Sequence, residues 1–273
     1  PNASNSSHIG KEIASPCTWY GVFCIGGSVN RLNLTNTSIN GTLYRFPFSS
    51  LPNLEYVDLT LNYISGSIPP QIGNLSKLTY LDLQRNLFSN TIPREIGQLR
   101  NLQTLHLNGN GLNGSIPEEM GELRSLSDLA LADNYLEGSI PASLGNLKNL
   151  TDLYFYNNSL SGPIPPEIGY LDNVVSIYMY RNHLSGPIPP SFGNLNMLEA
   201  LHLYSNNLSG LIPPELGNLT SLDSLSLFNN NLNGSIPPSL GNLTNLTILH
   251  LYGNQLSGSI PKELGNLKFL EDL

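Results

Sequence analysis

The sequence predicts an α/β solenoid, a right-handed superhelix with one long parallel sheet on its concave side and short 3₁₀ turns and loops on its convex side. The first observation is a set of asparagines spaced 24 residues apart without a slip: Asn62, Asn86, Asn110, Asn134, Asn158, Asn182, Asn206, Asn230 and Asn254. The others are a leucine pattern before each asparagine and a Gly-x-Ile-Pro segment after it. A fixed period of this length is typical of a repeat array, in which each unit packs on its neighbours.

The leucine pattern predicts a short strand in every repeat. Counted from the recurring asparagine as position 0, apolar residues stand at positions −8, −5 and −3, as Leu102, Leu105 and Leu107 do before Asn110. The two-residue spacing of the last pair indicates a strand with one buried face. Identical strands in successive repeats stack in parallel, which predicts one long parallel sheet.

The asparagine column is explained by the turn after each strand, where backbone groups leave the sheet and need new hydrogen-bond partners. A buried side-chain amide has two N–H donors and an acceptor oxygen, so it can bond backbone groups of its own turn and of the adjacent turn. We therefore expect a ladder of asparagines along the solenoid axis.

The Gly-x-Ile-Pro segment, such as Gly114–Pro117, predicts the turn towards the convex side. Glycine allows backbone conformations that other residues resist, and proline fixes φ and limits helix formation. The segments that follow, of the type Glu-Leu-Gly-Asn-Leu, suit a short helical or 3₁₀ turn. Asn90 replaces the glycine in one repeat, and asparagine tolerates a left-handed backbone best after glycine.

Composition excludes several classes of function. The formal net charge is −8, which argues against nucleic acid as a partner because that needs a basic footprint. No apolar run long enough to span a membrane occurs, and no signal peptide is visible at Pro1, so we expect a mature or trimmed piece. His202 and His250 lie two strands apart, roughly 10 Å, too far to share one Zn²⁺. With no phosphate loop or nucleophile elbow either, we expect no metal, no cofactor and no enzyme activity.

Two cysteines, Cys17 and Cys24, are close together in the segment CTWYGVFC. They are either free buried thiols or a disulfide that closes a short loop in an oxidising compartment. The density of Asn-x-Ser/Thr sequons favours the disulfide and a chain of the secretory pathway. We expect some sequons to be glycosylated, with these candidates: Asn74, Asn113, Asn149, Asn207, Asn218 and Asn242.

With the L-x-G-x-I-P signature running from Val29 to Leu273, the chain resembles a plant-specific leucine-rich repeat receptor-like kinase ectodomain. CTWYGVFC is similar to that family's N-terminal cap, C-x-W-x-G-V-x-C. The stretch FPFSSLPNLEYVDL, followed by uninterrupted repeats, resembles the subfamily of male-discoverer-interacting, phytocytokine-sensing receptor kinases. We accordingly expect a cap over residues 1–28 and about ten 24-residue repeats over residues 29–273, truncated in the eleventh.

The resemblance implies an extracellular domain at the plasma membrane that binds a peptide and signals with a smaller leucine-rich repeat co-receptor. Any membrane span and kinase domain would lie outside this segment, in a missing C-terminal part. In those relatives, polar residues at positions −2 and −4 of four successive strands read the peptide. The matching positions here are Tyr180, His202, Phe228 and His250, of which only His250 keeps the expected residue type.

The candidate binding residues come from positions −4 and −2, which point away from the core onto the concave face. In the C-terminal half these columns become aromatic, and the nine candidates are Tyr154, Tyr156, Tyr178, Tyr180, His202, Tyr204, Phe228, His250 and Tyr252. A simpler explanation is that aromatics suit strands and were copied by duplication. The functional explanation is a binding strip for a peptide or protein, because contiguous exposed aromatic surface usually marks an interaction site.

Charges flank this strip. Asp128, Asp152, Glu199 and Asp223 are at positions −6 or −7, and Arg181 is at position −1. Solvated charges are the default interpretation, although acidic flanks would favour a ligand with lysine or arginine.

Two alternatives to a receptor stay open at this point. One is a secreted inhibitor of pathogen cell-wall hydrolases, similar to the polygalacturonase-inhibiting proteins, and the other is a repeat scaffold without a ligand of its own.

Overall fold

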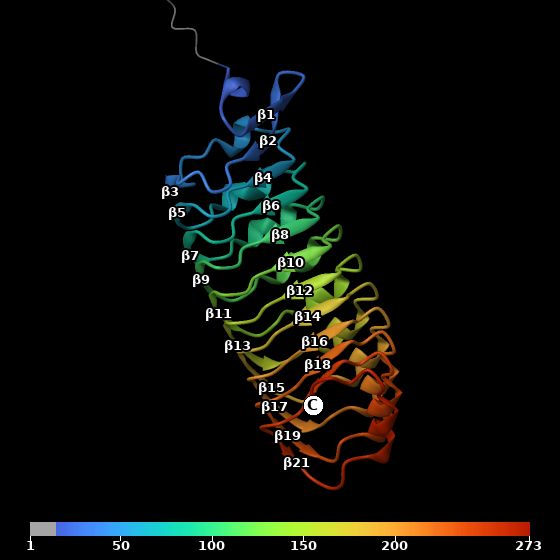
Figure 1. Ribbon diagram of the computed structural model, residues 1–273. Coiled ribbons are helices and arrows are strands. Elements are labelled where there is room, and N and C mark those ends of the chain that lie inside the picture. Colours follow the sequence, from blue (N-terminus) through green and yellow to red (C-terminus); the bar gives the residue numbers. More distant parts are fainter. Residues whose placement is uncertain (1–14) are drawn as a thin grey trace, which may run out of the picture.

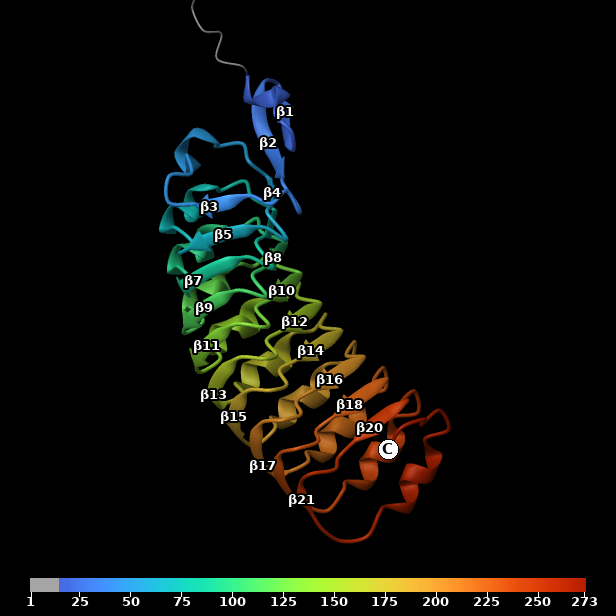
Figure 2. The same ribbon diagram turned by 60° about the vertical axis from the view of Figure 1, so that its left-hand side comes forward.

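The computed structural model describes residues 15–273. The chain forms an elongated stack of repeats with its N-terminal strands at one end and its C-terminal strands at the other (Figure 1). Turned by 60°, the stack is seen to bend, with one sheet along the inner side of the bend (Figure 2). Part of the expected cap, residues 1–14, lies outside the described residues.

The concave sheet has 11 strands in the order β1-β2-β4-β6-β8-β10-β12-β14-β16-β18-β20. All pairs from β2 onwards are parallel, and Leu129 pairs with Leu105 on one side and Leu153 on the other, one repeat away each. The predicted parallel sheet is confirmed. Its strands are β1 (Val22–Ile25), β2 (Ser28–Asn33), β4 (Tyr56–Asp58), β6 (Tyr80–Asp82), β8 (Thr104–His106), β10 (Asp128–Ala130), β12 (Asp152–Tyr154), β14 (Ser176–Tyr178), β16 (Ala200–His202), β18 (Ser224–Ser226) and β20 (Ile248–His250).

A second sheet of 10 strands runs along the stack beside the first. The sequence predicts only a turn here, and the structure differs because the residues just after each asparagine pair with the neighbouring repeats before the chain turns. Gly66 (φ +80°) and Asn90 (φ +66°) are both left-handed, as expected for this position. The strands are β3 (Asn40–Thr42), β5 (Tyr63–Gly66), β7 (Leu87–Thr91), β9 (Gly111–Gly114), β11 (Tyr135–Gly138), β13 (Ser159–Pro163), β15 (His183–Gly186), β17 (Asn207–Leu211), β19 (Asn231–Gly234) and β21 (Gln255–Leu256).

Short 3₁₀ helices complete each repeat, as predicted. A proline precedes each helix from η3 onwards, and a glycine near the helix end allows the next repeat to approach closely. A Cβ on Gly73 would lie 2.6 Å from the backbone oxygen of Glu95. The helices are η1 (Pro16–Thr18), η2 (Phe48–Ser50), η3 (Pro70–Asn74), η4 (Arg94–Gln98), η5 (Glu118–Glu122), η6 (Ala142–Asn146), η7 (Pro166–Tyr170), η8 (Pro190–Asn194), η9 (Pro214–Asn218), η10 (Pro238–Asn242) and η11 (Lys262–Asn266).

The asparagine ladder is confirmed. Asn134 is buried, and its Nδ2 donates to the backbone oxygens of Leu107 (3.0 Å), Leu131 (3.1 Å) and Ala132 (3.1 Å). Its Oδ1 accepts from the backbone N–H of Leu112 (3.0 Å) in the preceding repeat. The same contacts recur along the stack, so these amides link consecutive turns around a leucine-rich core.

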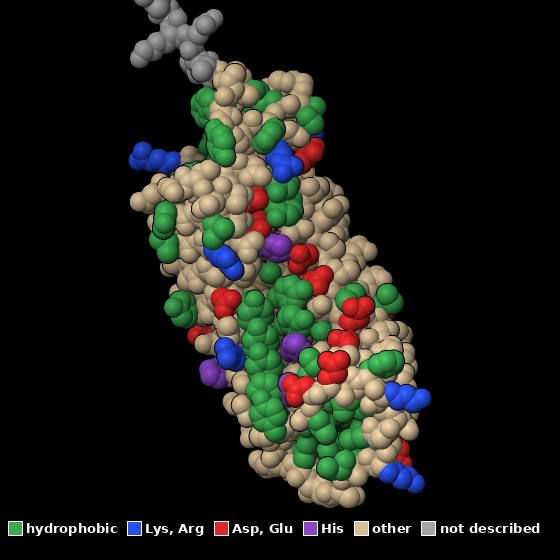
Figure 3. All heavy atoms as spheres, in the orientation of Figure 1, with side chains coloured by type: hydrophobic (Ala, Val, Ile, Leu, Met, Phe, Trp, Pro, Cys, Tyr) green, Lys and Arg blue, Asp and Glu red, His purple; other side chains and the backbone are tan. Residues whose placement is uncertain are grey.

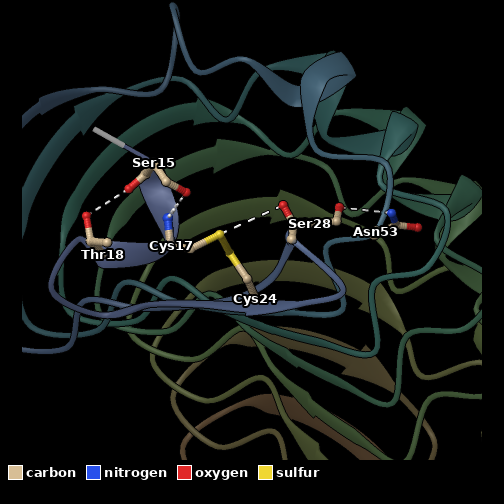
Figure 4. Close-up of a disulfide and its surroundings, with 7 residues drawn as sticks. Ser15, Cys17, Thr18, Cys24, Ser28 and Asn53 are labelled. Carbon is tan, nitrogen blue, oxygen red and sulfur yellow. Dashed lines mark hydrogen bonds between the residues drawn. A yellow bond between two sulfur atoms is a disulfide. The ribbon is translucent and has the colours of Figure 1, made fainter. Parts of the chain in front are cut away.

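The first repeat is capped by an antiparallel hairpin of β1 and β2. Gly26 and Gly27 form its turn with φ of +58° and +78°, which suits the primed turns of two-residue hairpins. Cys17 and Cys24 form a disulfide, so the disulfide prediction is confirmed and the free-thiol alternative is wrong (Figure 4). Nearby, Asn53 Nδ2 donates to Ser28 Oγ at 2.9 Å and connects the hairpin to the next repeat.

Candidate functional site

The concave sheet presents three columns of side chains, at positions −6, −4 and −2. The alternating positions −5 and −3 are buried, as Leu153 and Phe155 show with 0% exposure each. Because strand residues alternate between two faces, positions two apart share the face opposite to these buried residues. The structure thus brings all nine candidate residues together on one face, over β12 to β20.

Five rings at position −2 form a continuous stack, which we call the ring ladder: Tyr156, Tyr180, Tyr204, Phe228 and Tyr252. Successive ring centroids are 4.6, 4.3, 4.3 and 4.6 Å apart, and the ring planes deviate by 16° or less. Figure 3 shows an unbroken hydrophobic stripe along this face, with most of the nearby acidic side chains on one flank. Since the ring faces are used on one another, the ladder presents ring edges and hydroxyl groups outwards.

A shorter stack lies beside the ladder at position −4. Tyr154 and Tyr178 have centroids 5.1 Å apart, and Tyr178 lies 4.6 Å from the ring of His202. Ser226 then interrupts the column, and His250 contacts the ladder through an edge-on arrangement with Phe228 at 6.0 Å. His202 is further held by a 2.8 Å hydrogen bond between its Nε2 and Ser224 Oγ.

Burial determines the protonation of these groups. Burial raises the pKa of Tyr154, and the hydrogen bond from its hydroxyl to Asp152 (2.7 Å) raises it further. The pKa of Tyr180 is also raised, first by burial and then by Tyr204 and Tyr156. The pKa of His202 is lowered, mainly by burial and then by His250. Tyr154, Tyr180 and His202 are therefore neutral near neutral pH.

The N-terminal half of the face is less purely polar than the columns at −4 and −2 suggest. At position −6, Tyr56 stacks on Tyr80 with centroids 4.3 Å apart and 5° between planes, and the Arg31 guanidinium lies 3.9 Å from the Tyr56 ring centre. Position −6 was missed as a third column, although the same period-2 alternation would have found it.

His106 links three repeats in this half. Its Nδ1 lies 3.1 Å from Asp82 Oδ2 and its Nε2 2.8 Å from Asp128 Oδ2. Burial alone would lower the pKa of His106, but the hydrogen bonds and charges of Asp128 and Asp82 raise it to about 9. Burial would raise the pKa of Asp82, yet the hydrogen bonds from His106 and from the Gln84 backbone lower it. The three side chains thus form a charged cluster near neutral pH.

The six candidate glycosylation sites are all exposed. Asn74, Asn218 and Asn242 end the 3₁₀ helices η3, η9 and η10, and Asn113 and Asn207 belong to strands of the second sheet. Asn149 differs because its Nδ2 donates to the backbone oxygen of Arg124 at 2.9 Å. Glycosylation at these positions stays a prediction.

Within residues 15–273, no helix has the length and apolar character of a membrane span. The concave face offers aromatic edges, hydroxyl groups and carboxylates in fixed positions.

Comparisons with known proteins agree with this architecture. The model of the leucine-rich repeat region matches residues 32–162, and the leucine-rich repeat model matches residues 173–195, 197–219, 221–243 and 245–267. MDIS1-interacting receptor like kinase 2 from Arabidopsis thaliana is 58% identical over 73 residues, which are 26% of this chain and 7% of that protein. This segment thus matches only a small part of that relative's length.

Solved structures extend the likeness over the whole chain. The ectodomain of the Arabidopsis thaliana receptor kinase GASSHO1/SCHENGEN3, in complex with CASPARIAN STRIP INTEGRITY FACTOR 2, superimposes with a TM-score of 0.91 and 38% identity, covering 99% of this chain and 33% of that one. The Arabidopsis receptor kinase HAESA, in complex with the peptide hormone IDA and the co-receptor SERK1, gives 0.83 and 34%, covering 97% and 49%. The likeness is to ectodomains, outside any kinase domain. The chain therefore belongs to the leucine-rich repeat family and has the ectodomain fold of that family's plant receptor kinases.

Proposed function

We propose that this chain is the extracellular ligand-binding part of a plant receptor kinase and that it binds an extended peptide along the concave strip. The observation that carries the proposal is the ring ladder from Tyr156 to Tyr252, a preformed aromatic surface over five successive repeats. Similar ectodomains in complex with a peptide hormone support this kind of ligand.

The dimensions fit a short peptide. Strands of a sheet lie about 4.8 Å apart, so five stacked rings span roughly 20 Å, which is about six residues of extended chain. Tyrosine hydroxyls along the edge of the ladder and the imidazoles of His202 and His250 would bond the peptide backbone or its hydroxyl side chains. Ring edges would contact its apolar side chains.

Assembly with a co-receptor is the second part of the proposal. The relative in complex with SERK1 supports a leucine-rich repeat co-receptor kinase as partner. The chain would then lie on the extracellular side of the plasma membrane, with the membrane span and kinase supplied by the rest of the protein. Size-exclusion chromatography of this chain mixed with a co-receptor ectodomain tests this part. If the two elute separately both with and without a selected peptide, the co-receptor proposal is contradicted and peptide binding is unaffected.

Peptide binding is tested with peptides selected from a displayed random-sequence library. Tyr180→Ala and Tyr204→Ala should each weaken binding of a selected peptide on the order of tenfold or more, as expected for central aromatic anchors. Tyr135→Ala is the matched control, because Tyr135 is 70% exposed on β11 of the other sheet. Titration by calorimetry, with thermal melts to confirm folding, provides the measurement. Unchanged affinity in both strip variants would rule out this site.

A further inference from the structure

Charge is distributed unevenly between the concave face and the rest of the molecule. Over the whole chain, Asp and Glu number 20 and Lys and Arg number 12. Across positions −7 to −2 of all described repeats, Arg31 is the one Lys or Arg side chain. The acidic side chains in these positions are Glu55, Asp58, Asp82, Asp128, Asp152, Glu199, Asp223, Glu271 and Asp272.

A row of small side chains lies along one side of the aromatic strip. It consists of three residues at position −6 of adjacent strands, Ser176, Ala200 and Ser224, which pair in register. Several other repeats carry tyrosine or aspartate at this position, as Tyr80 and Asp152 show. On the strip side the row borders Tyr178 and His202, whose rings stack on each other. His202 bonds to Ser224, which is buried, whereas Ser176 and Ala200 are half-buried.

Two carboxylates border the other side of this row. Glu199 and Asp223 directly precede β16 and β18, and the Asp223 backbone N–H donates to the Glu199 backbone oxygen at 2.8 Å, so the two residues are neighbours. Both are exposed, and within residues 15–273 neither forms an ion pair. Position −1, on the other side of the ladder, carries charges of both signs, with Arg85, Asp133 and Arg181. Figure 3 shows the acidic groups gathered along one flank of the hydrophobic stripe.

We propose that the ligand of the strip is a basic peptide, and that a lysine or arginine side chain lies over Ser176 and Ala200, between Tyr178 and the carboxylates of Glu199 and Asp223. This inference rests on the proposed function. The side-chain stem would pass over these small residues, against the stacked rings, and the cation would reach two unpaired carboxylates. Lysine and arginine commonly bury an apolar stem while the charged end stays in water.

The His202 imidazole beside the row of small residues does not oppose a cation. Burial lowers the pKa of His202, and His250 lowers it further, so the ring is neutral near neutral pH. Its Nε2 is held by Ser224 Oγ. The charged side chains that border the row are those of Glu199 and Asp223, and their negative charge also steers a cationic peptide towards the face before contact.

The test uses a displayed random-sequence peptide library selected against the whole chain. The selected peptides should be enriched in lysine and arginine. In titrations, replacing the peptide's lysine or arginine residues with glutamine or citrulline should weaken binding to the parent chain on the order of tenfold. In the double variant E199Q/D223N, the charged and the neutral peptides should bind with nearly equal affinity. The matched control is E118Q with E215Q, which removes the same charge from exposed residues of η5 and η9.

Three outcomes separate the inference from the function on which it rests. Peptides that require Tyr204 but show no preference for lysine or arginine would overturn the inference and leave the proposed function standing. If neutralising the peptide reduced its affinity for E199Q/D223N as much as for the parent, the cation would bind elsewhere, and the inference would also be overturned. Selected peptides that bind Tyr180→Ala and Tyr204→Ala as tightly as the parent would overturn both.

Discussion

The rings of Tyr180 and Tyr204 lie face to face, with 4.3 Å between their centroids and 9° between their planes. On its other face Tyr204 meets Phe228 at the same distance. Each of these side chains therefore supports the next across the repeats, and the ladder contributes to the rigidity of the concave face as well as to its chemistry. Phe228 also shows that a ring without a hydroxyl fits the ladder.

Tyr204→Ala should destabilise the chain by about 1–3 kcal/mol, because two stacked pairs each contribute about 0.5–1.5 kcal/mol beyond simple burial. Tyr204→Phe should cost little, since phenylalanine already occupies the next position of the ladder. Denaturant titrations of both variants against the parent provide the measurement. Equal stability of the alanine and phenylalanine variants would show that the stacking contributes nothing.

The His106 cluster predicts a stability that decreases with rising pH. The pKa of His106 is about 9 in the folded chain against 6.5 for the free side chain, so the folded state holds its proton more tightly. Its contribution, about 3 kcal/mol at most, is complete below about pH 6.5 and is lost as pH rises through about 9. Denaturation midpoints at pH 6, 7, 8 and 9 should fall in the parent and change less in His106→Gln.

The control for this prediction is His183→Gln, which changes an exposed histidine on β15 of the other sheet. This variant should keep the pH dependence of the parent. If His106→Gln and the parent gave parallel curves from pH 6 to 9, the cluster would not hold an extra proton.

Asn158→Ala should destabilise the chain by about 1–3 kcal/mol, the cost of leaving buried polar groups without partners. The Asn158 Oδ1 accepts from the Leu136 backbone N–H at 3.0 Å, and its Nδ2 donates to the Leu131 backbone oxygen at 3.0 Å. Thermal melts provide the comparison. Asn146→Ala is the control, because Asn146 is exposed at the end of η6. If the two variants had indistinguishable melting temperatures, the stabilising role of the asparagine ladder would be contradicted.

Gly73→Ala should be destabilising. A Cβ on Gly73 would meet the Glu95 backbone oxygen of the next repeat at 2.6 Å. Forcing an extra methyl into a packed contact costs typically about 1–3 kcal/mol. Gln71→Ala is the control, because Gln71 is exposed on the same helix, η3. Denaturant titrations of both variants check this, and equal midpoints would contradict a packing role for Gly73.

Much of the repeat could be predicted because it depends on local spacing. The leucines at positions −5 and −3, the asparagine turn, the left-handed Asn90 and the 3₁₀ helices all follow from periods and residue preferences that act within one repeat. The second sheet could not be found in this way. Its strands are stabilised by pairing with adjacent repeats, as Tyr135 pairs with Asn113, and the single repeat reads only as a turn.

The candidate strip was predictable as a set of residues on one face, but the contacts between them were not. By itself, the sequence determined the 24-residue frame and the aromatic columns from Tyr154 to Tyr252, because hydrophobic burial fixes which side of each strand faces the core. Only the tertiary structure decided that ladder rings stack face to face, that His106 joins Asp82 to Asp128, and that Glu199 and Asp223 stay unpaired among the described residues, beside the stacked rings of Tyr178 and His202. These are contacts between residues one or more repeats apart, and their geometry depends on how successive turns of the solenoid are laid against each other.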